Sequence, residues 1–256
     1  METFLLELRR RNALLFWFGI YNFIIAFICL GFLAFDHTFI TGEHAYAKPF
    51  KYALSTVLIS WNLGWILFHL SSKKIISIFS WVNVVSMFVV VSIIFFQSFR
   101  GMPSYYNIST PFNSMLYVIL ASFDIVFLLM MIFLTLSFFR QKKMPISQHY
   151  TWGIRMGLLL FVLFSFVGIM MMSMMSHTIG GLDGEKGLYF LNWSVKHGDL
   201  RIIQFMGVIA LPIVSLTSYY AFKKKNQVLL FSFTYFLLGL TLFILTLMDI
   251  PLIPIR

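Results

Sequence analysis

Cysteine, acidic residues and charge of either sign are scarce in this chain of 256 residues. The one cysteine, Cys29, excludes a disulfide framework and a zinc or iron–sulfur centre held by thiolates. Charged residues make up 11% of the chain, whereas soluble domains carry about 25%. Hydrophobic residues make up 60%. This composition indicates a protein that crosses a membrane several times.

Seven apolar runs are long enough to cross the hydrocarbon core of a bilayer, which takes about 20 helical residues. No run alternates with a period of two, which disfavours a β-barrel. The sequence therefore predicts an all-α bundle of seven transmembrane helices that forms a single domain over 1–256. The predicted spans are 13–35, 50–70, 75–96, 112–139, 152–175, 202–222 and 228–248.

The lysines and arginines stand in short clusters between these runs, a pattern that indicates membrane topology and not nucleic-acid binding. With the N-terminus in the cytoplasm, the inside bases are Arg9, Arg10, Arg11, Lys73, Lys74, Arg140, Lys142, Lys143, Arg155, Lys223, Lys224 and Lys225. The outside bases are Lys48, Lys51, Arg100, Lys186, Lys196, Arg201 and Arg256. The excess inside predicts a cytoplasmic N-terminus and an extracytoplasmic C-terminus. The composition suggests a bacterial inner membrane.

The outside segments are longer and chemically richer than the inside loops. Residues 176–201 form the longest interruption and include His177, Asn192, Asp199 and Arg201. Because binding sites concentrate in longer, varied loops, the outer face is the predicted functional face.

Lys48, Lys51, Arg100 and Arg201 stand at the outer ends of spans. Long basic side chains there often extend to lipid head groups. Alternatively, they line one pocket for an anionic group, since arginine binds carboxylate or phosphate in bidentate fashion. The candidate ligand-binding residues are Lys48, Lys51, Arg100, Ser104, Asn107, Asn192, Trp193 and Arg201, and His177 and Asp199 are the candidate catalytic pair.

Polar residues inside the spans repeat at helical spacing, so each set shares one helix face. Lipid would penalise such faces, and we expect them to point into the bundle. An alternative is that serine and asparagine join helices by hydrogen bonds. The intramembrane candidates are Ser55, Asn62, Asn83, Gln97 and Asp124.

Asp124 is the only acid near the middle of a span, where a charge costs at least roughly 2.5 kcal/mol. It acts either as a proton relay or substrate contact, or as a structural partner of Asn62, Asn83 or Tyr117.

Several motifs are missing. No His-x-x-x-His pair, Gly-x-Ser-x-Gly elbow or phosphate-binding glycine loop occurs, and no metal ligands are assigned. The methionines of 170–175 beside His177 would suit Cu(I), but methionine also fills gaps between helices.

Three outer blocks resemble those of a family of uncharacterised bacterial multi-pass membrane proteins with seven spans. They are Tyr46-Ala-Lys-Pro-Phe-Lys-Tyr-Ala-Leu-Ser55, Gln97-Ser-Phe-Arg-Gly-Met-Pro-Ser-Tyr-Tyr-Asn107 and Gly187-Leu-Tyr-Phe-Leu-Asn-Trp-Ser-Val-Lys-His-Gly-Asp-Leu-Arg201. The resemblance implies that these blocks matter for function, and it supplies no mechanism.

The sequence thus predicts an extracytoplasmic basic and polar pocket that binds or chemically processes an anionic amphiphile, such as a membrane lipid. One alternative is a proton-coupled secondary transporter that uses Asp124. Another is a membrane protein that binds haem, quinone or copper. No nucleic-acid partner is expected, and the sequence assigns neither a cofactor nor an oligomeric state.

Overall fold

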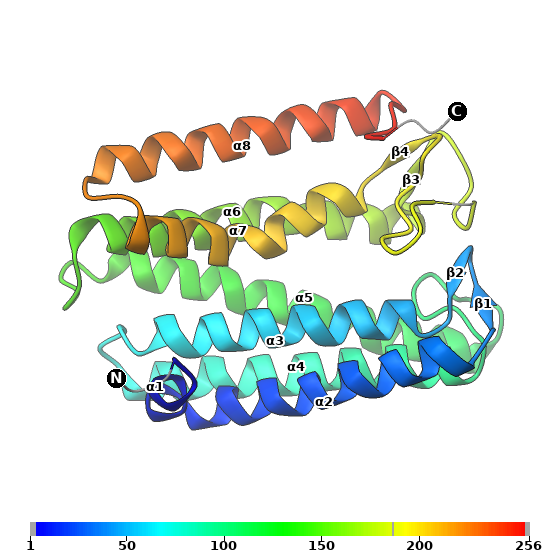
Figure 1. Ribbon diagram of the computed structural model, residues 1–256, viewed down its shortest axis with the longest axis horizontal. Helices are drawn as coiled ribbons and strands as arrows, with labels where there is room; N and C mark the ends of the chain where they lie inside the picture. Colours follow the sequence, from blue (N-terminus) through cyan, green and yellow to red (C-terminus); the bar gives the residue numbers. More distant parts are fainter. Residues whose placement is uncertain (1–3, 186, 254–256) are drawn as a thin grey trace.

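The computed structural model describes residues 4–185 and 187–253, and the described chain is almost entirely helical (Figure 1). A short helix, α1 (Phe4–Arg11), precedes seven long ones. The long helices are α2 (Ala13–Phe35), α3 (Ala47–Leu67), α4 (Lys73–Phe99), α5 (Pro111–Arg140), α6 (Gln148–Met174), α7 (Arg201–Tyr220) and α8 (Lys225–Leu247). Two antiparallel strand pairs complete the fold: β1 (Phe39–Ile40) with β2 (Glu43–His44), and β3 (Thr178–Ile179) with β4 (Gly198–Asp199).

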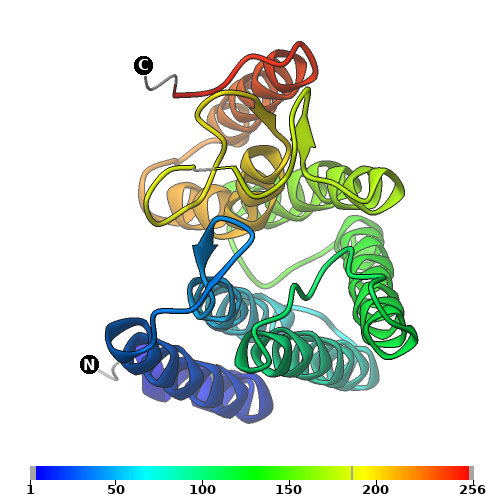
Figure 2. The same ribbon diagram turned by 90° about the vertical axis from the view of Figure 1, so that its right-hand side faces the viewer.

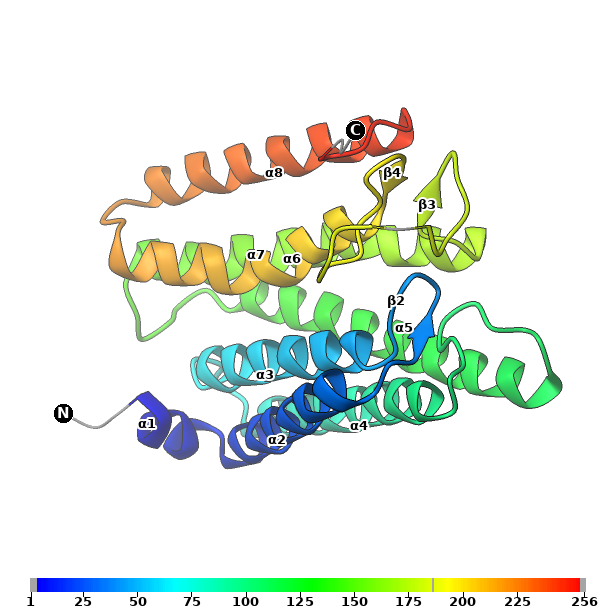
Figure 3. The same ribbon diagram turned by 45° about the vertical axis from the view of Figure 1, so that its right-hand side comes forward.

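The long helices run side by side in two groups. Helices α2, α3 and α4 form one group, α6, α7 and α8 form the other, and α5 lies beside α4 and α6 (Figure 2). Helix α3 packs against α2, α4 and α7, so it lies between the groups (Figure 3). Close packing of α2 on α3 depends on Gly19, because a Cβ there would overlap the Trp61 ring.

Among the described residues, six helices are long and apolar enough to cross a membrane: α2, α4, α5, α6, α7 and α8. They indicate an all-α, multi-pass membrane protein. The remaining predicted span, 50–70, does form a helix, but α3 does not belong to the apolar set. Its lower hydropathy has a structural reason, since Thr56 and Ser60 are buried against neighbouring helices, where no lipid reaches them.

The helices extend beyond several of the predicted runs. Helix α3 begins at Ala47, three residues before the apolar run, so Lys48 and Lys51 both lie on the helix. Helix α6 begins at Gln148 and not at Trp152. An apolar run shows only the part of a helix that lipid or the protein core surrounds. The helical backbone continues beyond that part into polar first turns and caps.

The two ends of the bundle differ. The strand pairs and the longest loops gather at one end, and α1 lies at the other with the basic loops between α3 and α4, α5 and α6, and α7 and α8 (Figure 1). We call these the strand end and the basic end. Lys186 and Arg256, both counted among the outside bases, lie outside the described residues.

The basic end holds the largest hydrophobic core cluster. It is built by residues from the corresponding halves of α2 to α7. Leu63, Leu134, Phe138, Ile154 and Leu158 are fully buried there. This packing closes the basic half of the bundle.

Candidate functional site

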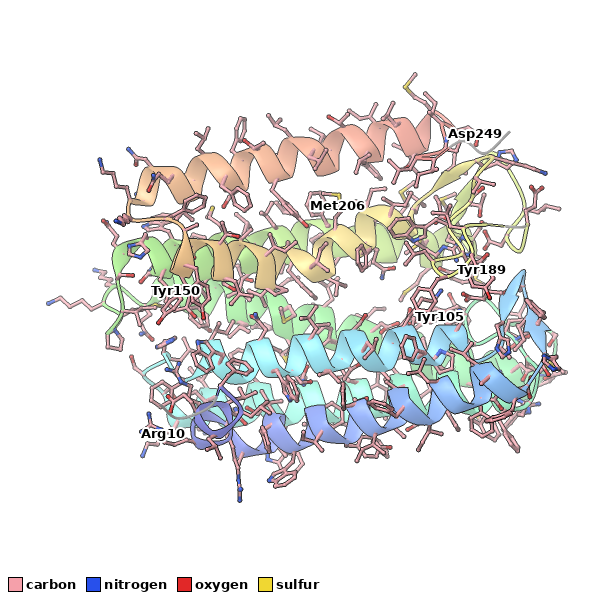
Figure 4. The ribbon with its side chains drawn as sticks, in the orientation of Figure 1. Arg10, Tyr105, Tyr150, Tyr189, Met206 and Asp249 are labelled. Atoms are coloured by element: carbon pink, nitrogen blue, oxygen red, sulfur yellow. The ribbon has the colours of Figure 1, made fainter. Side chains whose placement is uncertain are left out.

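Three segments meet at the strand end: the β1–β2 hairpin, the loop 100–110 and the segment 175–200. Figure 4 places Tyr105 and Tyr189 toward this end, and Arg10 and Tyr150 at the opposite one. Asp249, just after α8, also lies here and binds Nδ1 of His197 at 3.0 Å and the amide of Gly198 at 3.1 Å. The polar loops therefore form a connected cap over the helices.

A first pocket lies between the hairpin, the start of α3 and the loop 100–110. We call it the Lys48 pocket. It encloses about 250 Å³, part of it open to solvent. Its lining consists of Ile40, Thr41, Glu43, His44, Ala45, Lys48, Ser98, Met102, Pro103 and Ser104.

Lys48 is the available positive charge of this pocket. Within the described chain, no carboxylate lies in ion-pair distance of Lys48, whose Nζ sits 4.7 Å from the centre of the Tyr105 ring. Lys51 differs, since its Nζ lies 2.6 Å from Glu43 Oε2 and also reaches the carbonyls of Phe190 and Leu191. Lys51 therefore ties the hairpin to the segment that carries Phe190 and Leu191, whereas Lys48 has no such ion pair among the described residues.

Ser104 supplies an unused polar group. It is 4% exposed, and its buried hydroxyl has no hydrogen-bond partner among residues 4–185 and 187–253. A buried hydroxyl without a partner costs about 1–3 kcal/mol, which a bound acceptor or donor would recover. His44 is committed elsewhere: Nε2 lies 2.6 Å from the Asp36 carbonyl, and Nδ1 accepts from the Tyr46 amide.

A second pocket of about 200 Å³ lies on the other side of the hairpin. We call it the Arg201 pocket. Its lining consists of His177, Thr178, Leu182, Gly184, Glu185, Asn192, Ser194 and Arg201. The two pockets are neighbours, because Thr41 lines the first and accepts a 3.4 Å hydrogen bond from Asn192, which lines the second.

Asp199 and Arg201 form a buried ion pair in the wall of the second pocket. The Asp199 side chain is fully buried and accepts from Arg201 Nη2 at 2.6 Å, from Arg201 Nε and from the Ser194 amide. Burial alone would raise the pKa of Asp199, but the Arg201 guanidinium outweighs it and holds that pKa below its usual value. Arg201 also donates to the Asn192 carbonyl. Its charge is therefore matched inside the protein.

His177 lies beside this pair. Its Nδ1 is 3.2 Å from Asp183 Oδ1 and 3.9 Å from Asp199 Oδ1. Burial, and then the nearby Arg201, lower the pKa of His177 to about 4, so the ring is neutral at physiological pH. With the Nδ1 proton assigned to the Asp183 side, Nε2 carries the lone pair that can accept a proton or a hydrogen bond.

The structure does not bring the four predicted bases around one pocket. Arg100 is exposed, donates to Gln97 Oε1 at 2.6 Å and to Asn113 Oδ1 at 2.9 Å, and lines neither pocket. Asn107 is bonded to the Pro103 carbonyl and to Ser109, and so shapes its own loop.

Trp193 packs its ring on Phe205 and not into a pocket. Asn83 donates to Ser60 Oγ at 3.0 Å, which is the helix-joining role. Ser55 and Asn62 are half-buried on α3.

Asp124 has a partner that the sequence did not suggest. Its Oδ2 accepts from the Tyr105 hydroxyl at 2.7 Å, and none of Asn62, Asn83 and Tyr117 forms the expected bond to it. The sequence offered one clue, the polar loop containing Pro103 and two tyrosines, but no local pattern shows that this loop enters the bundle.

Comparison with protein-family models, curated proteins and solved structures finds no match to this chain. Within the described ranges, no group of three or more histidine, cysteine or carboxylate side chains could hold a metal ion. The site must therefore be judged on its own geometry, as two adjoining polar pockets on a multi-pass membrane protein.

Proposed function

We propose that this protein spans the membrane seven times, with a cytoplasmic N-terminus, and binds the anionic head group of an amphiphile in the Lys48 pocket from the extracytoplasmic side. The observation that carries the proposal is the pairing of Lys48, which has no carboxylate partner in the described chain, with the unsatisfied hydroxyl of Ser104 in one pocket. A cation and a hydroxyl together recognise a phosphate, sulfate or carboxylate group.

The position of the pocket supports an anionic ligand. It lies at the start of α3, and a helix N-terminus carries a partial positive charge. Pro49 has no amide hydrogen, and Tyr46 provides no side-chain cap for the first turn. The free backbone donors there add to the charge of Lys48.

The surroundings of the pocket support an amphiphile. Ile40 and Met102 give the lining an apolar part. Phe39 and Phe99 are each 69% exposed, and they adjoin the lining residues Ile40 and Ser98 in the sequence, so they add apolar surface beside the pocket. The space of about 250 Å³ includes open solvent, so the pocket is small and would take a head group while the acyl chains stay outside it.

The packed core at the basic end supports binding at one face and not transport through the bundle. Residues from α2 to α7 fill that half with apolar side chains. A transporter needs a path that opens to both sides, whereas both pockets described above lie at the strand end.

A second candidate function is chemical processing of the bound amphiphile at the Arg201 pocket. The observation that favours it is the neutral His177, whose Nδ1 lies 3.1 Å from Thr178 Oγ1 and 3.2 Å from Asp183 Oδ1. A neutral imidazole can accept a proton as a general base.

Binding can be measured on the full chain in phosphatidylcholine nanodiscs, titrated with short-chain phosphatidylglycerol, short-chain phosphatidylcholine or inorganic phosphate. The proposal expects phosphatidylglycerol to bind and phosphatidylcholine to fail. Binding of phosphate alone at equal affinity would show that the acyl chains contribute nothing, which refutes the amphiphile.

Variants locate the site. Lys48→Ala should weaken phosphatidylglycerol binding about 10-fold or more, since a charge-assisted hydrogen bond contributes about 1.5–3 kcal/mol. Lys196→Ala is the matched control, because it removes an exposed base from the same end of the protein. Equal affinity of the Lys48→Ala and wild-type proteins would overturn the proposal.

A further inference from the structure

Asp124 is joined to the Lys48 pocket through one side chain. Tyr105, which donates to Asp124 at 2.7 Å, belongs to the same loop as Met102, Pro103 and Ser104 of the pocket lining. Asp124 stands near the middle of α5, about 20 Å along the helix from Pro111 at 1.5 Å per residue. The loop therefore reaches into the bundle and connects the pocket with a half-buried acid.

Lys48 contacts the ring of the same tyrosine. The Lys48 Nζ lies 4.7 Å from the centre of the Tyr105 ring, and the Tyr105 hydroxyl donates to Asp124, so one phenol ring lies between the lysine and the carboxylate. Tyr52, one turn after Lys48 on α3, lies against the same ring at 5.9 Å.

The charged groups that act on Lys48 from other elements are mostly paired with one another. Glu43 on β2 lies 2.6 Å from Lys51, Arg201 is paired with Asp199, and Asp183 lies beside His177 at 3.2 Å. Tyr52 and Tyr117 contribute phenols, which are uncharged near neutral pH. Without a ligand, Lys48 and an ionised Asp124 sum to zero. An added anion would leave one uncompensated negative charge in a medium of low dielectric constant, which is unfavourable unless Asp124 takes up a proton.

We propose that the Lys48 pocket takes up its anion together with a proton, which binds to Asp124. The site then stays neutral in both states: lysine with carboxylate when empty, lysine with anion and carboxylic acid when filled. Tyr105 is the positioning residue that holds Asp124 toward Lys48. This inference rests on the proposed function, since it requires that an anion binds beside Lys48.

Because anion binding and protonation of Asp124 are coupled, the affinity of the protein for the anion should fall as pH rises, when ionised Asp124 repels the anion. By reciprocity, the anion increases proton binding by the same factor. The probe must not titrate itself, so we choose short-chain phosphatidylglycerol, a phosphodiester with constant charge from pH 5 to pH 8. Dissociation constants are compared across about that range for the full chain in phosphatidylcholine nanodiscs.

We expect wild-type affinity to fall about 10-fold from the acid to the alkaline side of this range, within the usual extent of coupling between sites. Asp124→Asn should bind tightly at every pH, because it mimics the protonated acid. Glu7→Gln is the control, because it removes a carboxylate from α1 at the basic end, away from both pockets. It should keep the wild-type pH dependence.

The outcomes are separable. Lys48 could itself lose its proton as pH rises, and in that case Asp124→Asn would keep the wild-type slope, which overturns the coupling. Wild-type binding that is independent of pH also overturns the coupling but leaves the proposed function intact. Absence of phosphatidylglycerol binding at any pH overturns both. Should Asp124→Asn fold poorly, calorimetric titration of the wild type in two buffers of different ionisation enthalpy measures the proton directly, and zero uptake refutes the proposal.

Discussion

Removal of Asp199 should destabilise the cap at the strand end strongly. The carboxylate is fully buried, and Asp199→Ala deletes its bonds to Nε and Nη2 of Arg201 and to the Ser194 amide. Breaking a buried ion pair from one side costs about 3–5 kcal/mol. In the variant, the Arg201 side chain, which is 22% exposed, keeps its hydrogen bond to the Asn192 carbonyl, so this bond and water offset part of the lost stability. We therefore expect a loss at the lower end of that range, about 3 kcal/mol, which is about a 150-fold change in the unfolding equilibrium constant.

The assay is reversible unfolding of purified protein in mixed micelles with increasing denaturing detergent, read by Trp fluorescence. Arg201→Ala and the double variant Asp199→Ala/Arg201→Ala complete a thermodynamic cycle. The double variant should lose less than the sum of the single losses, because it leaves no unpaired charge. Glu185→Ala is the control, since its 3.5 Å contact with Lys196 is exposed and should be worth about 0–1 kcal/mol. Additive single losses, or a loss below about 1 kcal/mol for Asp199→Ala, would refute this account of the ion pair.

Two further predictions concern the same cap. Gly42→Ala should loosen the β1–β2 hairpin, because Gly42 has a φ of 76° and a Cβ there would lie 2.5 Å from the Gly184 carbonyl oxygen. Faster proteolysis within residues 36–46 would show this loosening, and an unchanged cleavage rate would contradict it. His177 should make the protein less stable as pH falls from about 6.5 to about 4, because burial lowers its folded pKa to about 4 and the unfolded chain then binds more protons. A His177→Gln variant should flatten this part of the stability curve, and an unaltered curve would exclude the histidine as its cause.

The helices could be predicted from the sequence because apolar runs are local. Helix α2 follows its predicted run, 13–35, from end to end. The exception is α3, whose polar residues lower its hydropathy although it forms a helix.

The site was less predictable because it depends on contacts between distant segments. Helical spacing predicts that Lys48 and Lys51 share one face of α3. Only the position of the β1–β2 hairpin shows that Glu43 pairs with Lys51 and not with Lys48. Arg100 stands in a block that pointed to the pocket, yet its guanidinium caps the contact between α4 and α5. The course of the loop that carries Tyr105 depends on side chains of α3 and α5 and has no signature in its own residues.

The modest hydropathy of α3 has a consequence for how the protein is made. A segment with Lys48, Lys51 and Asn62 partitions poorly into lipid by itself. Helix α2 offers it a surface, because Gly19 accommodates Trp61, whose indole donates to the Phe16 carbonyl at 3.3 Å, and Gly64 lies near Leu15. On the proposed seven-span topology, α2 and α3 would enter the bilayer together as a helical hairpin, and the apolar α2 would stabilise the more polar α3. Lys48, which α3 carries, would then reach its final position through the insertion of α2.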